Sequence, residues 1–345
     1  MDAITTKISK LIFIPILIMT MLALFSGGCG WNNVQPPKTT DNKQNESQSG
    51  GQKAENGIGQ GAVQNDEQGR EQDKIQNSNI QDNGQNSASP ASVVTLVNES
   101  GTTIEERFSV PSGFERIAVQ EGSFEEYLRQ LPLKPHGTEV KYYDGRIKPR
   151  EVHEAVIDID VGDRDLQQCA DAVMRLRAEY LYRNGLYDKI HFNFTNGFRA
   201  DYNKWVQGYR ISVNNNTVSW VKRTGYSTDY ASFRSYMDMV FAYAGTLSLS
   251  REMQPVSIEE MKIGDVFIKG GSPGHCVIVV DMAENKDSGE KLFMLAQSYM
   301  PAQDIHILKN PESENLSPWY SLDFREQLAT PEWIFTKDQL MRFED

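Results

Sequence analysis

The chain has 345 residues, enough for one large domain or two smaller ones, and its composition is 39% hydrophobic and 24% charged. A formal net charge of −12 at pH 7 argues against a nucleic-acid partner, because phosphate binding needs a basic surface. The histidines and cysteines do not recur at the spacing of metal ligands. We therefore expect neither a metal nor a cofactor.

Residues 1–29 have the pattern of a secretory signal. Lys7 and Lys10 precede an apolar run that ends at Phe25, and two glycines stand directly before Cys29. This ending resembles the signal of bacterial lipoproteins, which implies that Cys29 carries lipid and anchors the chain to the extracytoplasmic face of a bacterial membrane. The alternative is an uncleaved anchor, because the apolar run and the glycines nearly reach the roughly 20 residues that span a bilayer.

Residues 30–92 are rich in Gln, Asn, Gly and Ser, and Trp31 is their only aromatic residue. Such a segment cannot bury enough apolar surface to offset its conformational entropy, so we expect a disordered tether. A flexible coil of about 63 residues has a root-mean-square span of about 45 Å. The tether would hold a single folded domain, residues 93–345, within reach of the cell wall.

Strands and helices are mixed along residues 93–345. Short apolar or alternating runs predict strands over residues 93–97, 104–110, 114–119, 140–143, 154–160, 189–194, 209–213, 218–222, 261–268, 275–281, 292–299, 304–308 and 333–335. Helices are predicted over residues 123–130, 165–184, 229–245 and 337–343. Because regular strand–helix alternation is missing, we expect an α+β fold with helices packed against an antiparallel sheet.

The helix over residues 165–184 places a cysteine close to its start. Asp165 is the predicted N-cap, with Gln168 three residues later as in a capping box. Cys169 then lies near the positive end of the helix dipole, where a thiolate is stabilised. The alternative is a buried core cysteine, because Cys169 also falls on the apolar stripe of this helix.

A hairpin is predicted from the strands 275–281 and 292–299. If Asp281 faces Lys291 across the turn, then His275 faces Gln297 and that amide can orient the imidazole. A cysteine at a helix N-terminus, a histidine and a polar orienting residue are the parts of a thiol hydrolase.

A disulfide is the competing interpretation of the cysteines. If Cys29 carries lipid, Cys169 and Cys276 remain, and an oxidising compartment favours their pairing. His275 and Cys276 are consecutive on a strand and should point to opposite faces. We therefore expect a bridge between the two cysteines and a pair of Cys169 with His275 to exclude each other.

Aromatic, amide and arginine side chains follow the strand 189–194. Such side chains suit a groove for glycan or peptide, and the alternative is a surface loop without a ligand. The candidate binding residues are Asn193, Asn196, Arg199, Trp205 and Arg210.

The order of the candidate catalytic residues along the chain can be compared with that of known enzymes. Cys169 on a helix precedes the strand Gly264-Asp265-Val266-Phe267, then Gly274-His275 and an apolar strand, then Gln297. This order is similar to that of the NlpC-type cell-wall peptidases of the papain-like superfamily. The resemblance implies a papain-like fold in which Cys169 is the nucleophile, His275 the base and Gln297 the orienting group, and in which peptidoglycan peptides are cleaved.

Longer segments look like those of an uncharacterised bacterial lipoprotein family, the domain of unknown function 4846. They begin at Cys169 (CADAVMRLRAEY), His191 (HFNFTNGFRADY), Gly270 (GGSPGHCVIVVD) and Leu295 (LAQSYMPAQ). This resemblance implies no known activity. Two hypotheses follow: a lipid-anchored cysteine amidase or peptidase acting on the cell envelope, and a non-catalytic domain of the same fold that binds wall glycan or an envelope protein.

Overall fold

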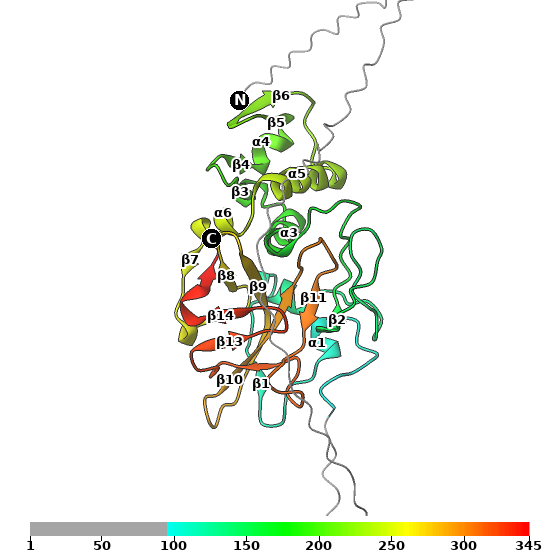
Figure 1. Cartoon of the computed structure of the whole chain (residues 1–345), viewed down its shortest axis with the longest axis vertical. Helices are drawn as coiled ribbons and strands as arrows, with labels where there is room; N and C mark the ends of the chain where they lie inside the picture. Colours follow the sequence, from blue (N-terminus) through cyan, green and yellow to red (C-terminus); the bar gives the residue numbers. More distant parts are fainter. Residues whose placement is uncertain (1–94, 345) are drawn as a thin grey trace, which may run out of the picture. The chain divides into compact units, whose positions relative to one another are not determined.

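The computed structural model describes residues 95–344, all of which belong to the unit Gly84–Asp345 (Figure 1). The predicted signal, the lipidation site at Cys29 and the whole predicted tether lie outside the described residues.

An antiparallel sheet of nine strands is the centre of the described part. Seven strands follow one another in the order β2-β11-β10-β9-β8-β15-β7, while β1 also pairs with β9 and β12 with β10. Their bounds are β1 (Glu115–Arg116), β2 (His153–Val156), β7 (Gln254–Pro255), β8 (Val266–Lys269), β9 (His275–Glu284), β10 (Lys291–Gln297), β11 (His306–Leu308), β12 (Tyr320–Ser321) and β15 (Leu340–Arg342). The predicted α+β class with an antiparallel sheet is confirmed.

Helices and smaller hairpins surround this sheet. The helices are α1 (Ile104–Arg107), α2 (Phe124–Arg129), α3 (Cys169–Arg183), α4 (Tyr202–Val206), α5 (Tyr230–Tyr243) and α6 (Thr246–Glu252). The hairpins are β3 (His191–Asn193) with β4 (Arg199–Asp201), β5 (Tyr209–Asn214) with β6 (Thr217–Lys222), and β13 (Gln327–Ala329) with β14 (Ile334–Thr336). Single 3-10 turns are η1 (Tyr187–Lys189), η2 (Ile258–Glu260) and η3 (Lys337–Gln339).

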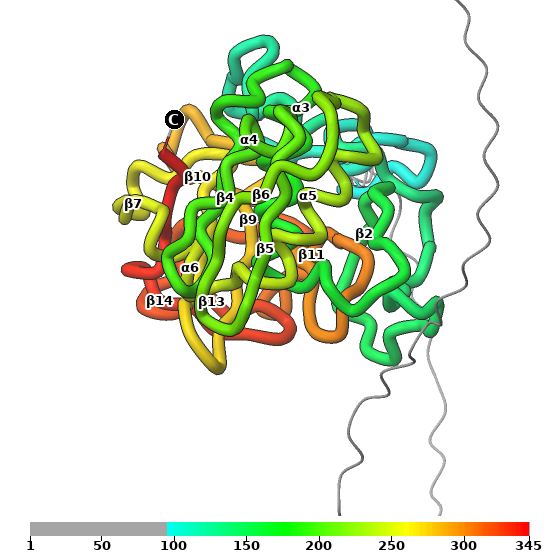
Figure 2. Tube along the Cα trace, turned by 90° about the horizontal axis from the view of Figure 1, so that it is seen from above, coloured from blue at the N-terminus to red at the C-terminus, as the bar shows by residue number. Residues whose placement is uncertain are grey.

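Helix α3 lies between the sheet and an upper lobe built from β3–β6, α4 and α5 (Figure 1). It packs against β9 on one side and against α5 and α6 on the other. Viewed from above, the lobe covers the middle of the domain (Figure 2). All residues of β9 from His275 to Ala283 are buried, which shows that the strand is covered on both faces. Its nearly continuous apolar sequence reflects this double burial, since strands covered on both faces lose the alternation of half-exposed strands.

A buried ion cluster ties β1 and α2 to the middle of β9. The Asp281 side chain is fully buried, and its two carboxylate oxygens each lie 2.7 Å from an arginine Nε, of Arg116 in β1 and of Arg129 in α2. The Met282 backbone amide donates a further hydrogen bond of 2.9 Å to this carboxylate. Such a cluster fixes where β1 and α2 dock on the sheet.

Two predicted elements form the other kind of secondary structure, and the described residues of the predicted strands 93–97 and 140–143 form only isolated bridges. Residues 104–107 form helix α1 instead of a strand, because the Thr103 hydroxyl accepts a hydrogen bond of 3.3 Å from the Glu106 amide and so caps a helical turn. The predicted closing helix over 337–343 is the short turn η3 followed by strand β15, in which Leu340 pairs with Phe267 of β8. Pairing with an open edge of the sheet outweighs the helical pattern of so short a segment.

Candidate functional site: a cysteine and a histidine at the start of helix α3 and strand β9

Helix α3 begins at Cys169, later than the sequence predicts. Asp171, three residues after Gln168, accepts a hydrogen bond of 2.9 Å from the Gln168 backbone amide. The predicted N-cap, Asp165, accepts hydrogen bonds from the Gln168 side chain (3.0 Å) and the Ala302 amide (2.7 Å) instead. The capping interaction is thus shifted by one turn. Cys169 becomes the first helical residue, at the positive end of the helix dipole.

Cys169 is buried but keeps a small solvent-exposed surface, 7% of the residue. Hydrogen bonding with the Cys276 thiol is the largest of the causes that lower the pKa of Cys169 to about 5, and burial opposes it. Hydrogen bonding with His275, the charge of that ring and the Ala170 backbone amide lower the pKa further. Cys169 therefore has the surroundings of a thiolate at neutral pH.

His275 and Gln297 are in direct contact, as predicted. The imidazole Nε2 of His275 lies 2.9 Å from the side-chain oxygen of Gln297, and both residues are 1% exposed. The His275 ring also packs on Tyr299 and Trp333, at 4.7 and 5.4 Å between ring centroids. These contacts fix the ring beside the thiol.

The register that led to this contact is wrong. Lys291 pairs with Glu284 and not with the predicted partner, and a β-bulge shifts the pairing after Met294. Beyond the bulge, His275 and Gln297 are diagonal neighbours and no longer directly opposite. Long side chains still reach each other across a diagonal, which is why the predicted contact forms.

The prediction that strand alternation keeps Cys276 away from the Cys169 thiol is wrong, although the two cysteines form no disulfide. The Cys169 thiol interacts with both residues, and both Cys169 and Cys276 are free. Cys169 is the first residue of α3, and His275 and Cys276 are the first two residues of β9. The Cys169 thiol therefore lies at the end of the strand. At the end of a strand, the alternation of side chains no longer restricts a contacting residue to one face of the sheet. Burial and the Cys169 thiolate raise the pKa of Cys276 well above that of an ordinary thiol.

Three residues near the pair were not predicted from the sequence. The Gln297 side-chain nitrogen donates to Glu332 (2.8 Å) and lies 3.3 Å from His306, and Lys148 forms an ion pair of 2.8 Å with Glu332. These contacts join residues that are far apart in the sequence, and no local motif marks them.

Asp171 is a buried acid next to the pair, and its carboxyl Oδ1 has no hydrogen-bond partner in the described part of the chain. Burial raises its pKa well above the usual value. The folded state then keeps a proton that the unfolded chain releases near pH 4, so this group's contribution to stability is complete at lower pH and is lost as the pH rises.

Replacing Asp171 with Asn should remove this pH-dependent loss. We expect the difference in free energy of unfolding between Asp171→Asn and the wild type to shift in favour of the variant by up to about 1.4 kcal/mol per pH unit above pH 4. Urea unfolding of both proteins at pH 4, 6 and 8 measures it. A difference that stays constant over this range would show that Asp171 titrates normally.

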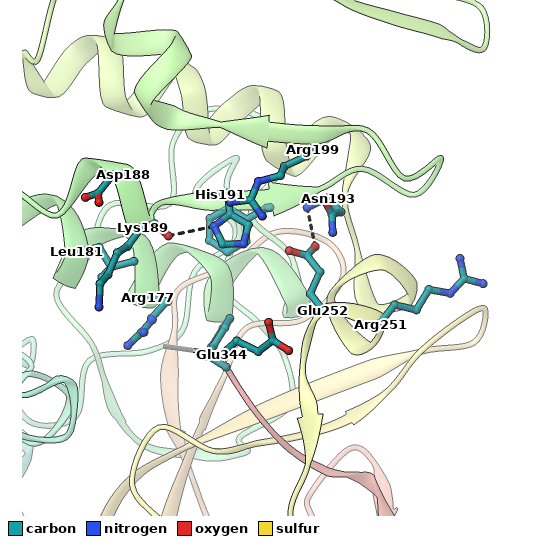
Figure 3. A pocket seen from close by; sticks show the side chains of 12 residues that line it. Arg177, Leu181, Asp188, Lys189, His191, Asn193, Arg199, Arg251, Glu252 and Glu344 are labelled. Atoms are coloured by element: carbon teal, nitrogen blue, oxygen red, sulfur yellow. Dashed lines mark hydrogen bonds between the residues drawn. The ribbon is translucent and has the colours of Figure 1, made fainter.

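The candidate binding residues do not form one groove. Asn193 and Arg199 line a cavity of about 460 Å³ (Figure 3). Trp205 is buried, with the Arg210 guanidinium stacked 4.2 Å from its ring centroid. Asn196 lies in the exposed turn between β3 and β4, where its side chain accepts a hydrogen bond from the Phe198 amide. The structure separates these residues because α4 turns the tryptophan into the core of the upper lobe.

The cavity that holds Asn193 and Arg199 is polar. Figure 3 shows the Glu252 carboxylate and the Arg199 side chain close to the His191 ring. Glu252 accepts a hydrogen bond of 2.5 Å from the Asn193 amide, and burial raises the pKa of Glu252 to about 7. Neither Cys169 nor His275 lines this cavity.

Among residues 95–344, no group of three or more His, Cys, Asp or Glu side chains could hold a metal ion. In the same range, no helix is long and apolar enough to cross a membrane.

The fold and the site define a mixed α+β domain that holds a cysteine–histidine pair, with the cysteine at a helix N-terminus. The chain belongs to the family described as Domain of unknown function (4846), whose model matches residues 104–342. No curated protein and no solved structure matches the chain.

Proposed function

We propose that this domain is a papain-like cysteine amidase or peptidase that acts on peptidoglycan peptides. One observation carries the proposal: Cys169 is the first residue of a helix, its thiol pKa is lowered to about 5, and it lies beside His275, which Gln297 holds at 2.9 Å. The order of these residues along the chain, similar to that of the NlpC-type peptidases, supports it.

The chemistry follows from this arrangement. The Cys169 thiolate attacks the carbonyl carbon of a peptide bond, and the carbonyl electrons move to oxygen, where amides at the α3 N-terminus stabilise the negative charge. His275 donates a proton to the leaving amine as the C–N bond breaks. A water molecule, deprotonated by His275, then attacks the thioester, releasing the acid product and restoring the thiolate.

The substrate class follows from the N-terminus. A lipoprotein-type signal ending at Cys29 would place the domain on the extracytoplasmic face of a bacterial membrane, and a tether spanning about 45 Å would bring it to the wall. Cross-linked peptides of the wall are the amide substrates available within that distance.

Cys169→Ala and His275→Ala should each abolish the release of peptides from purified peptidoglycan, detected by mass spectrometry of the soluble products. His136→Ala is a matched control, because the His136 side chain is 38% exposed and lies outside the pair; it should release peptides at the wild-type rate. Release that continues unchanged in Cys169→Ala would contradict the proposal.

The second candidate function is binding without chemistry. The polar cavity beside His191, with a carboxylate at its wall, is the observation that favours it. A wild-type protein that sediments with peptidoglycan, releases nothing and sediments equally well as Cys169→Ala would favour a binding domain for wall glycan or an envelope protein.

A further inference from the structure

A buried ion pair lies behind the amide that contacts His275. Lys148 Nζ is 2.8 Å from one carboxylate oxygen of Glu332, and the Gln297 side-chain nitrogen donates to the other, also at 2.8 Å. The side chains of Lys148 and Glu332 are only 5% and 10% exposed. A buried ion pair contributes little net stability, so its position raises the question of what it orients.

The chemistry of these groups determines which way the Gln297 amide faces. A carboxylate paired with lysine only accepts hydrogen bonds, so the Gln297 NH2 group must face Glu332. The second hydrogen of this NH2 points to His306 Nε2, at 3.3 Å. His306 Nδ1 faces the Asp304 carbonyl at 2.9 Å and so carries the hydrogen, which leaves Nε2 as an acceptor. Burial lowers the pKa of His306 to about 3, which keeps this ring neutral.

The amide in turn determines the tautomer of His275. With both Gln297 hydrogens committed, its oxygen faces His275 Nε2 and can only accept. The hydrogen of the neutral His275 ring must therefore be on Nε2. Nδ1 is left with the lone pair that can take a proton, as the proposed attack of water on the thioester requires.

We propose that Glu332 and Lys148 form a positioning pair that fixes the orientation of the Gln297 amide and thereby selects the Nε2–H tautomer of His275. The role of this tautomer as a base rests on the proposed function. Tyr299 also contacts both groups. Its ring packs on His275 and its centroid lies 5.3 Å from Lys148 Nζ, which helps to keep water from Lys148 and Glu332.

Glu332→Gln tests the proposal, because the new side chain can donate a hydrogen bond to Gln297 where the carboxylate can only accept one. Lys148 would hold the oxygen of the new amide, so that the NH2 group of this amide would face Gln297. The Gln297 oxygen would then turn toward that NH2 group and away from His275. At a pH at which the His275 ring is neutral, we expect nitrogen NMR of this ring to show the Nδ1–H tautomer, which is not populated in the wild type. Alkylation of Cys169 at pH 6 should slow about twofold if its pKa rises from about 5 to about 6, and by a factor that approaches ten for each further unit.

Two further variants complete the experiment. Glu121→Gln makes the same substitution at an exposed residue, and both signals should match those of the wild type. Lys148→Met/Glu332→Leu removes both charges and leaves no unpaired ion, so it provides a folded protein if Glu332→Gln unfolds. The Nδ1–H tautomer should appear in it as a second population, because only the weaker contact with His306 then orients Gln297.

An unchanged Nε2–H tautomer and an unchanged alkylation rate in a folded variant would overturn the positioning role. Neither readout uses a substrate. A failure of the wild-type protein to cleave peptidoglycan would therefore count against the proposed function alone, and a failure of the tautomer to respond would count against the positioning pair alone.

Discussion

Replacing Asp281 with Ala is expected to lower the free energy of unfolding by about 3–5 kcal/mol. The substitution leaves Arg116 and Arg129 without the carboxylate that each contacts at 2.7 Å, and the Arg129 side chain is only 6% exposed. The loss arises mainly from burying cations without a partner, because these arginines cannot lose their charge. Urea denaturation followed by circular dichroism measures the effect.

Asp287 provides a matched control in the same hairpin. It is exposed in the turn between β9 and β10, and Asp287→Ala should change the free energy of unfolding by no more than about 0.5 kcal/mol. A loss below about 1 kcal/mol for Asp281→Ala would contradict the view that this cluster docks β1 and α2 on the sheet.

The fold class could be predicted because its evidence is local. The apolar run from His275 and the turn signal at Asn285 are sufficient to identify the central hairpin, and the apolar stripe from Cys169 identifies α3. Short elements failed for a physical reason. Periodicity cannot distinguish helix from strand in segments as short as 104–107 and 340–342. The Thr103 cap makes the first segment helical, and pairing with β8 makes the second a strand.

The candidate site could be predicted only in part. The contact between His275 and Gln297 was predicted correctly from a register that was wrong, because a bulge in β9 cannot be recognised from its residues. Glu332 and Lys148 could not be predicted at all, since their contacts depend on how distant segments fold together. The place of Cys276 beside the thiol depends on the strand end, which alternation does not describe.

The second large expected effect concerns the reactivity of Cys169. With its thiol pKa lowered to about 5, more than about nine tenths of Cys169 should be thiolate at pH 6, whereas an ordinary thiol with a pKa of about 8.5 is less than about 1% ionised there. The pKa of Cys276 is raised by burial and by Cys169, so Cys276 should remain protonated and unreactive. His275→Ala removes both a hydrogen bond and a charge and should raise the pKa of Cys169.

The pH dependence of iodoacetamide alkylation, read at each cysteine by peptide mass spectrometry of the folded protein, tests the nucleophile most directly. We predict a midpoint near pH 5 for Cys169, a shift of that midpoint to higher pH in His275→Ala, and no labelling of Cys276 below pH 8. A midpoint near 8.5 for Cys169 in the wild type, or faster labelling of Cys276 than of Cys169, would contradict the assignment of Cys169 as an activated nucleophile.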